Sequence, residues 1–118
     1  MSIVRRGNER TTLVKEAFGG PGEITMTQLI NCPEELFGKG RLFNHVKIEP
    51  GKGLGWHIHH GDSETYYILK GHGEYSDNGN IIDVYSGDVM IVGDGEGHCI
   101  KNIGDETLEM IALIVYTD

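Results

Sequence analysis

Two histidines separated by a single residue, His57 and His59, are followed by Glu64 and, much later in the chain, by His98. Residues i and i+2 of a β-strand point to the same side, so the first two imidazoles can converge on one point. Imidazole nitrogens and carboxylate oxygens are common protein ligands of Mn, Fe, Ni and Zn, and so few ligands leave coordination positions open for water or a substrate. The pattern therefore predicts a site for one divalent transition metal ion, whose identity these ligands do not fix.

Glycines flank these residues at fixed distances. Residues 51–71 contain a glycine, five other residues, His-x-His, four residues, a glutamate, six residues and a glycine. In residues 87–102, a glycine is followed after five residues by Gly-x-Gly and then by His98 and Asn102. The two segments resemble, in order and at short spacing, the two sequence motifs of the cupin family. Gly93 stands at the proline position of the second motif, which loosens the turn before His98 but removes no ligand.

The resemblance to a small single-domain cupin implies an all-β fold, the double-stranded β-helix or jelly-roll barrel. It implies one domain over residues 1–118, with the motifs at 51–71 and 87–102. Residues 1–22 carry no motif and are expected to form an N-terminal arm or an edge strand. The expected metal ligands inside the barrel are His57, His59, Glu64 and His98.

The distribution of turn residues independently indicates an antiparallel β protein. Short β-branched and aromatic segments alternate with glycine-rich turns, and the pair Asn78-Gly79 is typical of a two-residue hairpin. Such regular spacing of eight or more strands favours a sandwich or barrel. The expected strands are Ile24–Ile30, Arg41–Glu49, Gly55–His59, Glu64–Lys70, Gly73–Ser76, Ile81–Tyr85, Asp88–Val92, Gly97–Asn102 and Thr107–Thr117, with a short turn at Cys32–Gly38.

Composition narrows the range of partners and compartments. The chain of 118 residues has a net charge of −8, which disfavours nucleic acid and anionic membrane surfaces as partners. The N-terminus lacks the apolar segment of a secretory signal, so a cytoplasmic location is expected. Cys32 and Cys99 do not form a C-x-x-C pair and are expected to be free, largely buried thiols. Cys99 should face away from the metal because it follows His98 on a strand.

Two further residues are candidates for catalysis. Tyr66 shares a strand face with Glu64, so its hydroxyl could point into the pocket and donate a hydrogen bond or a proton to a substrate. A tyrosine packed in the barrel wall is the simpler interpretation. Glu109, on the last expected strand, could enter the pocket as a general base, although a solvated face is again the simpler expectation.

The remaining polar residues near the motifs have less specific interpretations. His60 follows His59 and is expected at the rim, and Asp62 is expected to be a solvated turn residue. His72 is expected at the surface, whereas His45 could face either the pocket or solvent.

Function remains open at this level because one fold supports many reactions. The first hypothesis is a metalloenzyme acting on a small oxygen-rich or carboxylate metabolite, of the dioxygenase, decarboxylase, lyase or isomerase type. The alternative is a module that binds or senses a metal-chelated small molecule without turnover. A third hypothesis is a structural role for the metal. A homodimer is expected because Trp56, the apolar C-terminal strand and the N-terminal arm together offer more apolar surface than a small barrel covers.

Overall fold

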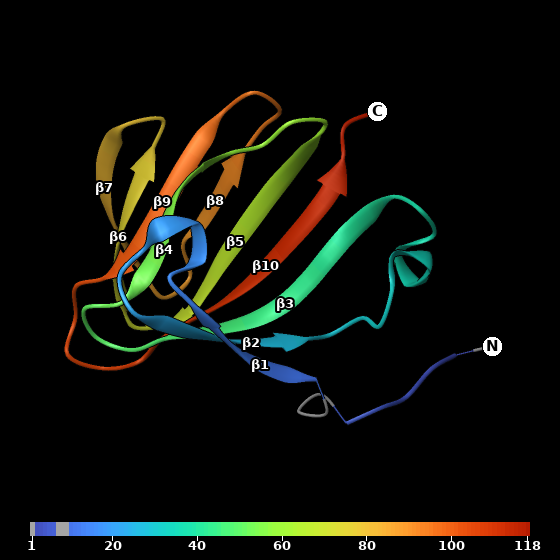
Figure 1. Cartoon of the computed structure of the whole chain (residues 1–118), viewed down its shortest axis with the longest axis horizontal. Coiled ribbons are helices and arrows are strands. Elements are labelled where there is room, and N and C mark those ends of the chain that lie inside the picture. The colour runs from blue at the N-terminus through green and yellow to red at the C-terminus, as the bar shows by residue number, and fades with distance from the viewer. Residues whose placement is uncertain (1, 7–9) are drawn as a thin grey trace.

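The computed structural model describes residues 2–6 and 10–118, and it consists mainly of two antiparallel sheets (Figure 1). The six-stranded sheet has the order β1 (Thr11–Lys15), β2 (Glu23–Gln28), β3 (Gly40–Ile48), β10 (Leu108–Tyr116), β5 (Asp62–Lys70) and β8 (Val89–Val92). The four-stranded sheet has the order β4 (Gly53–Ile58), β9 (Gly97–Asn102), β6 (His72–Asp77) and β7 (Asn80–Tyr85). Two short 3-10 turns, η1 (Ala17–Gly19) and η2 (Pro33–Leu36), complete the elements. Among the described residues, no helix is long and apolar enough to cross a membrane.

The two sheets share one hydrophobic core. Ile48, Ile68 and Met110 of the six-stranded sheet are completely buried, and they belong to the same cluster as Tyr75 and Ile100 of the four-stranded sheet. Each such aliphatic side chain contributes about 1.5–3 kcal/mol through burial. Consecutive strands such as β4 and β5 lie in different sheets, so the chain passes repeatedly from one sheet to the other. This arrangement confirms the predicted all-β double-stranded β-helix.

The strands occur where the sequence predicts them, with ends that shift by one or two residues. Strands β6 and β7 pair directly and are joined by Asn78 and Gly79, which have φ of 52° and 97°. Positive φ at both central residues is typical of the type I′ hairpin turn that the Asn-Gly pair predicts. The predicted turn at Cys32–Gly38 contains η2.

The N-terminal segment supplies both an edge strand and a cover for β4. Of the expected arm or edge strand over residues 1–22, residues 11–15 form the edge strand β1, whereas residues 1 and 7–9 lie outside the described residues. After β1, the chain turns through η1 and crosses β4 closely (Figure 1). The carbonyl of Phe18 occupies the position where a Cβ at Gly55 would lie, so only glycine at position 55 permits this approach.

Candidate metal centre

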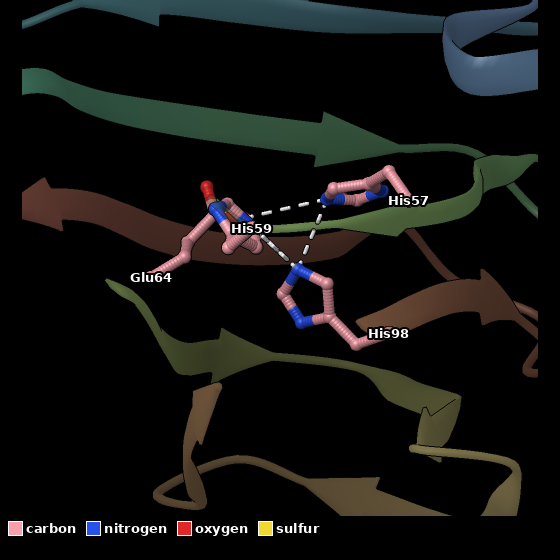
Figure 2. Close-up of side chains that lie close together, drawn as sticks. All are labelled: His57, His59, Glu64 and His98. Carbon is pink, nitrogen blue, oxygen red and sulfur yellow. Dashed lines mark hydrogen bonds and ion pairs between the residues drawn. The ribbon is translucent and has the colours of Figure 1, made fainter. Parts of the chain in front are cut away.

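The four predicted ligands lie together although they come from three strands and a loop. His57 on β4 is directly opposite His98 on β9 in the four-stranded sheet. His59 follows the end of β4, and Glu64 projects from β5 of the other sheet. Figure 2 shows the four side chains pointing toward one another, and their ligand atoms all lie within 4.8 Å of one another. The structure thus forms a cluster that could hold a metal ion.

The distances between the donor atoms suit a single ion. Nε2 of His98 lies 3.0 Å from Nε2 of His57 and 3.2 Å from Nε2 of His59. Oε1 of Glu64 lies 3.1 Å from the same His98 atom and 3.2 Å from Nε2 of His59. Two donors that are each about 2.1 Å from one ion are separated by about 3.0 Å at a right angle and about 3.4 Å at the tetrahedral angle.

The outer nitrogens of the three imidazoles are also engaged, which leaves the inner nitrogens available. Nδ1 of His57 donates to the carbonyl of Gly55 at 2.8 Å, because a carbonyl can only accept. Nδ1 of His59 lies 2.7 Å from a carboxylate oxygen of Asp62. Nδ1 of His98 lies 2.8 Å from the Tyr75 hydroxyl, which can accept from it. Contacts of this kind fix the tautomer in which Nε2 can bind a metal.

The charge states inside the cluster are those that metal ligands require. Burial alone would raise the pKa of Glu64, but its contacts with the imidazoles of His57 and His98 outweigh it and lower the pKa to about 2. Burial lowers the pKa of His98, against the opposing influence of the Glu64 carboxylate. An ionised carboxylate and a neutral imidazole are the forms that coordinate a cation.

Asp62 corrects one sequence prediction. It was expected to be a solvated turn residue, but it is 5% exposed and contacts both His59 and Arg41. Burial would raise the pKa of Asp62, but the hydrogen bonds from His59 and Arg41 lower it, so the side chain is a carboxylate. Nε of Arg41 donates to Asp62 at 2.9 Å. A chain of contacts therefore leads from Arg41 in the pocket lining through Asp62 to His59 in the cluster of candidate ligands.

The two predicted catalytic candidates lie in different places. Tyr66 is 2% exposed, lines the pocket, and stacks on the His98 ring with centroids 4.8 Å apart. Burial, together with the negative charge of Glu64, raises the pKa of Tyr66 well above its usual value, so its hydroxyl keeps its proton. Glu109 instead lies outside the lining of this pocket and contacts Nε2 of His45 at 3.0 Å.

The other histidines and Trp56 occupy the rim or the surface. His60 is exposed and lines the mouth of the pocket, as the sequence predicts, and His72 is half-buried beside Asp83 and Tyr85. Trp56 is 48% exposed and faces away from the ligands. A homodimer through this face stays a prediction.

Three of the four candidate ligands, His57, His59 and Glu64, line a pocket of about 320 Å³. Phe18 of η1 forms one wall and stacks on the His57 ring, with centroids 4.0 Å apart and an interplanar angle of 17°. No sequence pattern indicates this contact or the contact between Tyr75 and His98, because both depend on which segments cross in the folded chain.

Comparison with known proteins agrees with the fold and the cluster. The family model described as "Cupin domain" matches residues 44–116, which include all four candidate ligands. The chain belongs to the cupin family. A Thermotoga maritima protein named "oxalate-binding protein" is 38% identical over 113 residues, which cover 96% of this chain and 93% of that protein.

Solved structures show the same relationship. A Thermotoga maritima crystal structure, described as a predicted oxalate decarboxylase, superposes with a TM-score of 0.92 at 38% identity and covers 97% of this cupin and 99% of that chain. The cupin domain of Schizosaccharomyces pombe Cnp3 superposes with a TM-score of 0.71 at 18% identity, covering 89% of this chain and 68% of that one. The cupin domain of an Enterobacter cloacae XRE-family transcriptional regulator gives 0.69 at 18% identity, covering 80% and 98%. The last two relationships concern the fold alone.

Proposed function

We propose that this cupin binds a small chelating carboxylate, of which oxalate is the simplest, through one divalent metal ion held by His57, His59, Glu64 and His98. The observation that carries the proposal is the convergence of three imidazole nitrogens and one carboxylate oxygen at the wall of an open pocket. The ion would be Mn, Fe, Ni or Zn, since all of these accept this donor set.

The charge of the site favours an anionic ligand. Three neutral imidazoles and the Glu64 carboxylate reduce the charge of a divalent ion to about +1, which an anion can neutralise. When bound, the ion supplies Lewis acidity and open positions for two ligand oxygens. The similar Thermotoga maritima proteins, named for oxalate binding and for predicted oxalate decarboxylation, support this ligand class.

Residues of the chain would orient the ligand. The Tyr66 hydroxyl is protonated and lies in the pocket beside Glu64, so it can donate to a ligand oxygen. Arg41 lines the same pocket, and one of its nitrogens is held by Asp62. Both would favour a ligand whose oxygens are not all bound to the metal.

Turnover is the second candidate function, in the form of a decarboxylase or another metal-dependent conversion of a small carboxylate. Tyr66 and His60 are the pocket-lining groups outside the ligand set that could supply a proton. Asp62 is less suited to this role because His59 and Arg41 already hold both of its oxygens. Among the described residues that line the pocket outside the ligand set, only the exposed His60 is left as a free general base, which favours binding over turnover.

Calorimetric titration of oxalate into metal-free and metal-loaded protein tests the proposal. We expect binding to the loaded protein and its loss in His57→Ala, because that variant lacks one ligand. Carbon-13 NMR of labelled oxalate after prolonged incubation in air separates the two functions. Unchanged oxalate indicates binding, and steady formation of formate or carbonate indicates turnover. Failure of the loaded protein to bind any small carboxylate would refute both.

A further inference from the structure

The pocket beside the four candidate ligands has a larger volume than an oxalate ion fills. Its volume of about 320 Å³ corresponds to roughly ten water molecules at about 30 Å³ each. Oxalate is a flat dianion without a side chain, and its chelating end would lie against the ligands at the pocket wall. Room therefore remains beyond the chelating group for a substituent.

The walls of that remaining space are mostly apolar. Leu54 and Ile58 come from β4, and Phe18 comes from η1. The six-stranded sheet adds Met26, Leu42 and Ile114. Contact between an apolar wall and an apolar substituent is favourable. The same wall cannot replace the water molecules that solvate a charged substituent.

The charges at the pocket also favour a ligand with a single negative charge. A site at about +1 is neutralised by one carboxylate, whereas a dianion leaves an excess negative charge that must be compensated. Arg41 is a cation in the pocket lining, but Asp62 already offsets its charge through the 2.9 Å contact. His60 is exposed at the mouth, where water screens its interactions.

We propose that the ligand of this cupin is a chelating monocarboxylate with an apolar substituent, of the 2-oxo or 2-hydroxy acid class. The inference rests on the proposed metal-bound carboxylate and specifies what is attached to it. Glu64 and the three histidines hold the metal that binds the chelating end, and the substituent lies against Leu42, Leu54 and Phe18.

Titration of metal-loaded protein with a series of 2-oxo acids tests this inference. The chelating end stays constant from pyruvate through 2-oxobutanoate to 4-methyl-2-oxopentanoate, so intrinsic metal chelation changes little. Each buried methylene contributes about 0.8 kcal/mol, or about fourfold in affinity, so the branched acid should bind at least about tenfold more tightly than pyruvate. 2-Oxoglutarate, which has a charged tail, should bind more weakly than the branched acid.

Two results would overturn the inference. One is an affinity that stays level or falls as the chain lengthens, and the other is tighter binding of 2-oxoglutarate than of the branched acid. If oxalate still binds in either case, the proposed function survives and only the inference fails. If no carboxylate binds, the proposed function fails first.

A pair of leucine variants locates the substituent. Leu42→Ala removes part of the apolar wall and should reduce the ratio of the affinities for the branched acid and pyruvate by at least about threefold. Leu13→Ala is the matched control, because Leu13 is 60% exposed on β1 and does not line the pocket. It should leave the ratio as in wild type. An equal loss in both variants, or no loss in Leu42→Ala, would contradict the assigned wall.

Discussion

Removal of the Asp62 carboxylate should weaken metal binding even though Asp62 is not a ligand. Its Oδ1 accepts from Nδ1 of His59 at 2.7 Å, and its Oδ2 accepts from Arg41 at 2.9 Å. The first contact orients the His59 ring and makes its inner nitrogen a better donor to a cation. Asp62→Ala removes both effects, whereas Asp62→Asn keeps an amide oxygen that can still accept from His59.

The expected loss of metal affinity follows from the strength of the hydrogen bond between Asp62 and His59. The hydrogen bond is buried and involves an ionised carboxylate, and such bonds contribute about 1.5–3 kcal/mol. Because about 1.4 kcal/mol corresponds to tenfold in an equilibrium constant, Asp62→Ala should raise the metal dissociation constant about 10–100-fold. Asp62→Asn should lie near the lower end of this range, since it loses the charge but not the hydrogen bond.

Competition between metal-free protein and a chromophoric chelator measures these constants directly. The melting temperature of each metal-free variant shows that the barrel is folded. Asp83→Ala is the matched control, because Asp83 also faces a histidine, His72 at 3.8 Å, but lies outside this pocket. Wild-type affinity in folded Asp62→Ala would refute the reasoning, as would an equal loss in Asp83→Ala.

Three further predictions follow from the same structure. Tyr75→Phe removes the hydroxyl beside Nδ1 of His98 and should weaken metal binding about tenfold, measured by the same competition. Metal affinity should fall as the pH drops from about 7.5 to 5.5, because protons compete for the free imidazoles, whereas Glu64, with its pKa of about 2, stays ionised. Titrations at three pH values check this; a constant affinity would contradict the histidine ligands. Gly97→Ala should destabilise the fold by about 1–3 kcal/mol and shift the fluorescence of the single tryptophan, because the Trp56 ring occupies the place of the added methyl. Chemical denaturation measures the loss, and wild-type stability with unchanged emission would count against the contact.

The ligand cluster could be predicted from sequence because its geometry depends on local rules. Strand alternation places His57 on one face, and the motif spacing adds Glu64 and His98. The barrel then requires only that β4 pair with β9, which brings His57 opposite His98. Strand positions were predictable for a similar reason, since turn residues such as Asn78-Gly79 determine where strands end.

The surroundings of the cluster depend on contacts that no local pattern encodes. Asp62 follows Gly61 in a segment typical of exposed turns, but in the folded chain it is buried and accepts a hydrogen bond from Arg41 of β3, from which β5 is separated by β10. Tyr75 reaches His98 through the pairing of β6 with β9. Phe18, which stacks on His57, adopts a φ of 53°, a value that is uncommon for a phenylalanine and that no local pattern predicts.

The position of Glu109 could not be predicted because polar and apolar residues do not alternate in the segment that follows it. Residues 110–115 are all apolar, so the sequence does not indicate which side of β10 faces the core. In the structure, Met110 and Ala112 point into the core, and Glu109 pairs with His45 outside the pocket. On the outer face of β10, Glu109, Ile111 and Leu113 are half-buried and Val115 is exposed.

The most direct test of the account is elemental analysis of protein purified without chelator or immobilised nickel, alongside His57→Ala and Glu64→Gln. The account predicts about one equivalent of manganese, iron, nickel or zinc per chain in the wild type and a large loss in both variants. Wild-type protein that holds no metal, even after reconstitution with each of the four ions, would contradict the central claim.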